Sequence, residues 1–368
     1  MYPERISRLQ QRLRRRKLQA FLVTQPENRR YLSGFTALDH SIQESSGALL
    51  VPARGAPLLL TDSRFQLQAE QECSGLTISL YRRGLASLLC HLLPDMQVRR
   101  LGFESHYCLY GTAVRLKDRL AEAGIELVAT RDLVEQLRII KDADEIAVIR
   151  RSVALNEQVF RLVHATIEPG MTEQEIALAL ELTMRELGAE RPSFETIVAF
   201  GEHAAHPHAV PTDRILQSGD LVLIDMGLVL EGYCSDMTRT FAVGEPSSQF
   251  RERVRLVRRA QLAGIRTIRA GVTGREVDRA ARRVIADAGF GKYFQHALGH
   301  GVGLAVHEEP RLSAFSRRKL RPGMVVTVEP GLYLPDWGGI RLENMVVVRD
   351  DGCEVLNRDL TGMEFSDN

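Results

Sequence analysis

The amino-acid sequence predicts a mixed α/β protein with two domains, and three observations support this prediction. Residues 20–130 alternate short apolar runs with helical segments, which is typical of an α/β domain. The chain then becomes strongly charged around residue 131, before a long amphipathic segment begins. Further on, one short sequence pattern occurs twice. We therefore expect one domain over residues 1–131 and a second, internally repeated domain over residues 132–368.

The elements of the first domain follow from local patterns. Ile6, Leu9 and Leu13 recur at helical spacing among charged residues, and no apolar stretch follows that would make this segment a signal peptide. Short apolar runs predict strands at residues 20–24, 47–53, 57–62, 76–81, 99–105 and 125–130. Helices are expected at residues 64–73, 84–93 and 111–123.

The second domain begins with a predicted helix from Asp142 and then repeats its own construction. Residues 167–176 (IEPGMTEQEI) match residues 268–277 (IRAGVTGREV), and each copy contains T-x-x-E, the capping box that begins a helix. Each copy also delivers a pair of acidic residues on strand-like runs, namely Asp225 with Asp236 and Glu329 with Glu343. The repeat predicts two similar halves with a pseudo-twofold site between them.

The composition argues against several classes of partner. A net charge of +1 over 368 residues gives no global field that would attract nucleic acid or a membrane surface. No run approaches the ~20 apolar residues that a membrane-spanning helix needs. The five cysteines are scattered without a CxxC pair, which is typical of reduced thiols. We therefore expect a cytoplasmic protein that binds neither nucleic acid nor membranes.

The acidic pairs carry the strongest chemical signal. Asp225 directly follows the apolar run LVLI, and no lysine or arginine separates it from Asp236. His300, Glu329 and Glu343 lie at comparable strand ends further along the chain. If these five residues converge, four carboxylates repel one another and would bind protons unless cations neutralise them. Two divalent cations cancel the formal charge, and oxygen ligands with one imidazole suit a hard or borderline metal.

Histidines gather in the same half of the chain. A lone histidine is usually a core or surface residue without chemistry, but His208, His300 and His307 all lie beside strand-like runs in the acid-bearing half. His296 and His300 could share one helical face, although the glycines around them favour a strand or loop. This clustering predicts that histidines take part in the same site.

At these residues the sequence resembles the pita-bread metallopeptidases of family M24, which include aminopeptidase P, prolidase and methionine aminopeptidase. The matching stretches are PHAVPTD, LIDMG, GYCSDMTRTF, HALGHGVGLAVHE, VVTVEPGLY and GGIRLEN. The first domain resembles the creatinase/prolidase N-terminal domain through YLSGF and LLLTDSRF. The resemblance implies an α/β (α+β) chain with a C-terminal pita-bread domain, and it favours the proline-directed branch of the family.

The resemblance assigns roles to individual residues. Five positions match the metal ligands of the family: Asp225, Asp236, His300, Glu329 and Glu343. His208 and His307 match catalytic histidines that hold the substrate and stabilise the tetrahedral intermediate. Glu329 is also the candidate for the catalytic proton shuttle, because it can serve as both ligand and base. His296 and Arg341 match further substrate-binding positions.

The expected activity is hydrolysis of the Xaa-Pro bond at the N-terminus of short peptides, as an Xaa-Pro aminopeptidase or dipeptidase. Two divalent metal ions, Mn²⁺ in the first place and Co²⁺ or Zn²⁺ as alternatives, would bridge a hydroxide that attacks the scissile carbonyl. A methionine-type aminopeptidase, a creatinase-like enzyme and a non-catalytic pita-bread binding module are the alternatives, and the complete ligand set opposes the last two. Two positions depart from the family pattern: Met226 replaces a common phenylalanine, and Asn344 replaces a common acid.

The polar loop at residues 36–46 suggests a role for the first domain. Its position resembles that of the segment that reaches a neighbouring subunit's active site in this family. We therefore expect a homodimer in which Asp39, His40 or Glu44 meets the far end of a short peptide and limits substrate length. A solvated turn without function is the equally weighted alternative.

Overall fold

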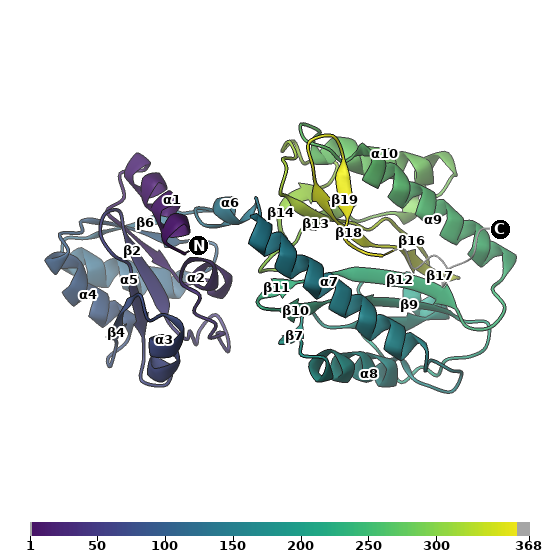
Figure 1. Cartoon of the computed structure of the whole chain (residues 1–368), viewed down its shortest axis with the longest axis horizontal. Coiled ribbons are helices and arrows are strands. Elements are labelled where there is room, and N and C mark those ends of the chain that lie inside the picture. Colours follow the sequence, from purple (N-terminus) through teal and green to yellow (C-terminus); the bar gives the residue numbers. More distant parts are fainter. Residues whose placement is uncertain (1, 359–368) are drawn as a thin grey trace. The chain divides into compact units, whose positions relative to one another are not determined.

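The computed structural model describes residues 2–358, so residues 359–368 of the expected second domain lie outside the described part. The chain divides into two compact units at Arg138/Ile139, a few residues beyond the expected boundary at 131/132 (Figure 1). The reason is that Leu133, Val134 and Leu137 are buried, so the charged stretch around them still packs within the first unit. The expected mixed α/β class is confirmed.

The first unit is built on a six-stranded mixed sheet with the order β4-β3-β2-β1-β5-β6. Its strands match the six expected runs: β1 (Ala20–Val23), β2 (Ala48–Pro52), β3 (Leu58–Thr61), β4 (Thr77–Leu80), β5 (Arg100–Glu104) and β6 (Glu126–Thr130). The helices are α1 (Tyr2–Arg15), α2 (Pro26–Ser33), α3 (Gln66–Glu72), α4 (Leu85–Asp95), α5 (Tyr110–Glu122) and α6 (Glu135–Arg138). Helix α2 was not predicted, although proline in its first turn and Gly34 at φ +82° after its end are helix boundary signals.

The loop at residues 36–46 is held from inside by Arg29 of α2. The guanidinium group is fully buried and lies 2.8 Å from Asp39 Oδ1, and it also donates to the backbone oxygens of Ala37 and Gly47. The Asp39 side chain is itself only 3% exposed. Asp39 therefore stabilises the loop, and the expectation that its carboxylate meets a peptide is wrong. His40 remains exposed at the loop surface.

The second unit consists of two helix pairs and several small antiparallel sheets (Figure 1). The helices are α7 (Ala143–His164), α8 (Glu173–Glu186), α9 (Ser248–Thr267) and α10 (Gly274–Asp287), with short 3₁₀ turns η1 (Gly201–Ala205) and η2 (Gly291–Tyr293). The sheets have the orders β11-β10-β7, β12-β9-β8, β14-β13-β15-β18-β19 and β16-β17. The strands are β7 (Arg191–Pro192), β8 (Ile197–Phe200), β9 (Leu221–Met226), β10 (Leu228–Leu230), β11 (Tyr233–Cys234), β12 (Met237–Ala242), β13 (Gly299–Gly301), β14 (Glu308–Leu312), β15 (Val325–Val328), β16 (Gly331–Leu334), β17 (Gly338–Arg341), β18 (Asn344–Val348) and β19 (Cys353–Val355).

The internal repeat is visible in these elements. Thr172 begins α8 and Thr273 begins α10, and in both helices the threonine and the glutamate three residues later form the predicted capping box. Each threonine also forms an isolated β-bridge to a later segment, Thr172 to Ile215 and Thr273 to Lys319. The two halves therefore share a helix pair and an antiparallel sheet that ends in acidic residues.

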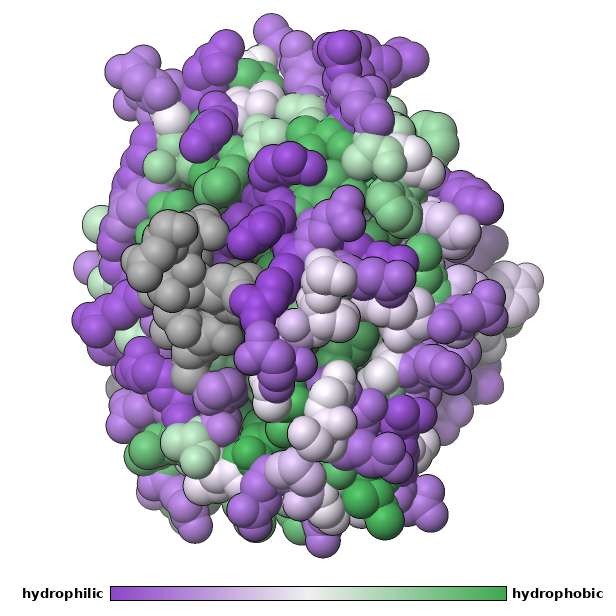
Figure 2. Space-filling model, turned by 90° about the vertical axis from the view of Figure 1, so that its right-hand side faces the viewer, coloured by the Kyte–Doolittle hydropathy of each residue, from purple (hydrophilic) through white to green (hydrophobic). Residues whose placement is uncertain are grey.

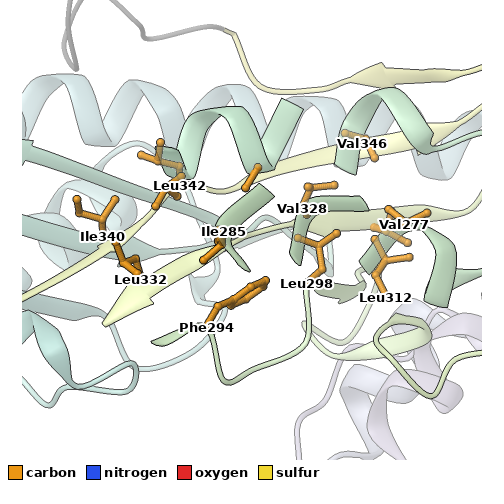
Figure 3. Packing of buried hydrophobic residues seen from close by; sticks show 14 of the residues in the cluster. Val277, Ile285, Phe294, Leu298, Leu312, Val328, Leu332, Ile340, Leu342 and Val346 are labelled. Carbon is orange, nitrogen blue, oxygen red and sulfur yellow. The ribbon is translucent and has the colours of Figure 1, made fainter. Parts of the chain in front are cut away.

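Helices α9 and α10 pack on the strands that lead to the acidic residues. The shared core, part of which Figure 3 shows, is mostly aliphatic and includes Val277, Ile285, Phe294, Leu298, Leu312, Val328, Leu332, Ile340, Leu342 and Val346. Within it, the buried Gln261 of α9 donates hydrogen bonds to Val328 O and Leu342 O, at 3.3 and 2.9 Å. Because those carbonyls directly precede Glu329 and Glu343, the core fixes the backbone from which both carboxylates project.

The face of the second unit that Figure 2 shows is largely hydrophilic, as expected for a chain with 26% charged residues. Hydrophilic residues cover much of the face in Figure 2, with hydrophobic residues interspersed among them. Within residues 2–358, no helix is long and apolar enough to cross a membrane.

Candidate metal centre and peptide site

Five predicted ligands come together from separate elements of the second unit. Asp225 lies in β9, and Asp236 immediately precedes β12, the antiparallel neighbour of β9. His300 is in β13, Glu329 directly follows β15, and Glu343 directly precedes β18. All five line one cavity of about 810 Å³. The repeat therefore delivers its two acidic pairs to a single site.

The distances between these groups are those of a compact polar cluster. His300 Nε2 lies 3.2 Å from Glu329 Oε1 and 3.5 Å from Asp236 Oδ2. Potential ligand atoms of Asp236, His300 and Glu343 all lie within 4.8 Å of one another. Glu343 Oε2 accepts a hydrogen bond from Thr238 Oγ1 at 2.7 Å, which orients this carboxylate.

The burial of the carboxylates fits a bound cation. Desolvation and the neighbouring negative charges raise the pKa of both Asp236 and Glu343 well above the ordinary range. In the described part of the chain, Asp225 Oδ1 and Glu343 Oε1 are buried without a hydrogen-bond partner. Buried polar atoms of this kind need a partner. Carboxylate oxygens with one imidazole are a donor set that divalent metal ions accept, so the residues fit such a group.

Arg341 supports Asp225, one of the five predicted ligands. The buried guanidinium group lies 2.6 Å from Asp225 Oδ2 and also donates to Thr238 Oγ1 and Pro207 O. A further bond of 2.6 Å joins it to the Tyr333 hydroxyl. Arg341 lines the cavity as predicted, but protein groups already accept four of its hydrogen bonds.

Tyr333 connects this network to His296. The phenol oxygen lies 3.0 Å from His296 Nε2, and His296 Nδ1 is 2.8 Å from Ala297 O. Burial raises the pKa of Tyr333 to about 12 and lowers that of His296, so both groups are neutral near pH 7. His296 lines the cavity but has both ring nitrogens bonded to protein groups. Sequence reasoning missed Tyr333, and no local pattern marks it.

His208 and His307 line the same cavity and have exposed surface. The His307 ring packs edge-on against the His300 ring, with centroids 4.4 Å apart. Burial, followed by the nearby His300, lowers the pKa of His307 to about 4. His307 is therefore a neutral imidazole at pH 7, with one N–H to donate and one nitrogen to accept.

A buried carboxylate that sequence reasoning missed holds the segment that carries His208. Glu173, the first residue of α8, accepts hydrogen bonds from the backbone N–H groups of Phe200 and Thr212, at 2.8 and 2.9 Å. It also bonds Thr212 Oγ1 at 2.6 Å and His203 Nδ1 at 2.8 Å. These contacts fix the chain on both sides of His208.

The cavity walls away from the acidic cluster are mostly apolar. They come from α8, β8, the segment after η1 and the loop before β14, and they include Ala177, Leu178, Phe194, Ile197, Val210, Pro211 and Val306. Arg311 adds an exposed cation to the lining. The cavity can therefore hold a small ligand with an apolar body and a negatively charged end.

Comparison with known proteins agrees with this geometry. Residues 147–350 match metallopeptidase family M24, and residues 5–140 match the creatinase/prolidase N-terminal domain. The chain belongs to metallopeptidase family M24, and the predicted family and enzyme class are confirmed. Metal-dependent peptide hydrolysis is the activity of this class, so the cluster described above is the expected place for divalent metal ions.

Individual relatives are similar over nearly the whole chain. An Xaa-Pro dipeptidase from Pyrococcus horikoshii is 33% identical over 357 residues, which cover 96% of this chain and 97% of the relative. The structure of an Xaa-Pro dipeptidase from Bacillus anthracis is 36% identical, with a TM-score of 0.91 and 98% of each chain covered. An X-Pro aminopeptidase from Thermotoga maritima is also 36% identical, with a TM-score of 0.85 and coverage of 95% and 98%.

Proposed function

We propose that this protein hydrolyses the Xaa-Pro bond at the N-terminus of short peptides. The observation that carries the proposal is the convergence of the five predicted ligands in one cavity, with buried carboxylate oxygens that lack a protein partner. The names of the similar proteins support the choice of bond, because both dipeptidases and an aminopeptidase act at X-Pro. The ligand set is Asp225, Asp236, His300, Glu329 and Glu343.

These residues would hold two divalent ions, Mn²⁺ by preference with Co²⁺ or Zn²⁺ as alternatives. Such ions would lower the pKa of a bound water, so that a hydroxide nucleophile is available at neutral pH. Glu329 would take up the proton of the attacking water and pass it to the leaving nitrogen. Its Oε1 accepts a hydrogen bond from Thr327 Oγ1 at 2.9 Å and lies 3.2 Å from His300 Nε2, and these contacts orient the carboxylate.

His208 and His307 act on the peptide carbonyl. A neutral imidazole N–H can donate to the oxygen that becomes negative during attack, and this donation stabilises the transition state more than the ground state. The lowered pKa of His307 supports this role, because the imidazole stays neutral near pH 7. Both side chains face the cavity that holds the carboxylates.

The apolar walls of the cavity are suited to contact a proline side chain next to the scissile bond. An Xaa-Pro bond has no N–H on its nitrogen, so the site must hold the pyrrolidine ring by contact. Phe194, Ile197 and Val306 provide such a surface. The exposed Arg311 is the cation that can receive the terminal carboxylate of a dipeptide.

Location and assembly complete the proposal. The five free cysteines support a cytosolic protein with reduced thiols. The resemblance of the loop at residues 36–46 supports a homodimer, and sedimentation or light scattering measures this state directly. Short proline-containing peptides are the proposed partners, without nucleic acid or membranes.

The test is hydrolysis of a small peptide panel after metal reconstitution. The panel contains an Xaa-Pro dipeptide, an Xaa-Pro-Yaa tripeptide, longer Xaa-Pro peptides and Met-Ala-Ser. We expect cleavage of the Xaa-Pro members and none of Met-Ala-Ser. Cleavage of Met-Ala-Ser alone would replace the proposal by a methionine-type aminopeptidase, and no cleavage by the metal-loaded protein would favour a binding module.

A further inference from the structure

Lys141 and Glu308 form a buried ion pair beside the loop that carries His307. Lys141 Nζ lies 3.1 Å from Glu308 Oε2, and the two side chains are 1% and 7% exposed. Glu308 directly follows His307, but the residues that line the cavity include His307 and neither member of the pair. A buried ion pair is weak evidence for stability, because its desolvation offsets much of the attraction. Fixing one local arrangement is the better explanation for such a pair.

The Glu308 carboxylate closes the short turn that ends at His307. Its Oε1 accepts a hydrogen bond from the Ala305 N–H at 3.0 Å, and Gly303 N–H donates to Ala305 O at 3.0 Å. The carboxylate also fills the space next to Gly303, where an added Cβ would lie 2.8 Å from each of its oxygens. The turn at residues 303–308 therefore folds around this one carboxylate.

Lys141 is itself fixed to the sheet that carries a metal ligand. Its backbone N–H donates to Gly323 O at 2.9 Å. Gly323 has φ +83°, and an added Cβ there would lie 2.8 Å from Lys141 O, so the two backbones are in close contact. Gly323 leads into β15, whose end carries Glu329. The ion pair thus connects the turn before His307 to the frame that holds Glu329.

The His307 ring depends on this connection. Within residues 2–358, no protein group forms a hydrogen bond to the ring, and its contact with the His300 ring is a packing contact at 4.4 Å. The position of the imidazole is therefore set by the backbone of the turn. Loss of the Lys141 charge removes the cation that lies 3.1 Å from Glu308 Oε2, so the buried carboxylate is less well compensated and the turn that it closes should shift.

We propose that Lys141 and Glu308 are positioning residues for peptide hydrolysis, which hold the His307 ring where it meets the peptide carbonyl. The inference rests on the proposed role of His307. Misplacing a reacting group by about 1 Å can lower a rate about 100-fold. Lys141→Met should therefore lower kcat about 10- to 100-fold, with a smaller change in KM and no change in bound metal.

A double-mutant cycle tests this inference. Kinetics are measured for wild type, K141M, H307A and the double variant K141M/H307A, with K141R as the conservative variant. R151M is the matched control, because it removes an exposed ion pair to Glu231 in the same unit. We expect the double variant to match H307A, K141R to keep most of the wild-type kcat, and R151M to be unchanged.

Two outcomes overturn the inference. One is a kcat of K141M equal to that of the wild type, and the other is a double variant whose fold decrease in kcat equals the product of the two single-variant decreases. Imidazole NMR of the metal-free protein gives a readout without turnover, since K141M should shift the His307 resonance and leave those of distant histidines in place. If K141M does not fold, E308Q enters the same cycle. If the proposed function is wrong, the wild-type protein will not cleave the Xaa-Pro members of the peptide panel. The cycle is then measured on whichever peptide the wild type cleaves.

Discussion

Replacing Glu173 by Gln tests whether a residue outside the cavity lining holds His208 in place. Each carboxylate oxygen accepts hydrogen bonds: Oε1 from the Phe200 N–H, and Oε2 from Thr212. In the Gln variant one of these oxygens becomes an NH₂ group, which cannot accept. At least one backbone N–H then faces another donor in a buried site.

The magnitude follows from these contacts. A hydrogen bond to a charged acceptor contributes about 1.5–3 kcal/mol, and an unsatisfied buried N–H costs about 1–3 kcal/mol. We therefore expect Glu173→Gln to lower the free energy of unfolding by about 3 kcal/mol. With a urea m value of about 3 kcal/mol/M, the midpoint should fall by about 1 M. The kcat should fall as well, because the segment with His208 loses its anchor.

Trp337 makes the assay specific for the catalytic domain. It is the only tryptophan in the sequence, and it stacks on the Arg253 guanidinium at 4.0 Å. Its fluorescence in urea therefore reports unfolding of this domain alone. Glu186→Gln, an exposed change in the last turn of the same helix, is the control and should leave the midpoint in place. A Glu173→Gln midpoint equal to that of the control would refute the reasoning.

Four further predictions concern the site and the loop at residues 36–46. Exhaustive chelation should abolish hydrolysis, divalent ions should restore it, and Glu329→Gln should remove nearly all turnover in a folded protein, as peptide assays and circular dichroism would show. Replacing His208 or His307 by Ala should lower kcat about 10²–10³-fold, the scale of one lost transition-state donor, while metal analysis shows unchanged content. Arg311→Met should raise KM for Xaa-Pro dipeptides more than for longer peptides, and an equal rise for both would contradict the carboxylate contact. His40→Ala should alter the preference for peptide length in a dimer, and unchanged preference would leave this loop as a solvated turn.

Sequence patterns predicted those features that depend on short-range order. The six strands of the first sheet follow from apolar runs, and the capping boxes at Thr172 and Thr273 follow from T-x-x-E. A shared site for the ligands was expected from the internal repeat and from the resemblance to family M24, and the mutual repulsion of four acids pointed to cations if they converged. The metal-site residues remain a prediction until metal binding to them is measured.

The supporting residues could not be predicted, because their roles depend on tertiary placement. Arg29 and Asp39 are ten residues apart, and nothing in the loop pattern shows that they pair inside it. Tyr333 lies in β16, and it forms hydrogen bonds with His296, which precedes β13, and with Arg341 in β17. Most acidic residues and tyrosines in such stretches are exposed to solvent. Only the packed structure shows which of them is buried and which partner it bonds.

The buried charges of the catalytic domain have a common arrangement around the cavity. Two close ion pairs occur there, Arg341 with Asp225 and Lys141 with Glu308, and the buried Glu173 carboxylate bonds His203 Nδ1 in addition. Apolar replacements of equal volume are often as stable as a buried ion pair, so stability alone does not account for them. Each pair instead ties a backbone segment next to a proposed reacting group to another part of the fold. Variants of these supports should therefore lose turnover through altered geometry while the ligands still bind metal, whereas variants of the ligands should lose both together.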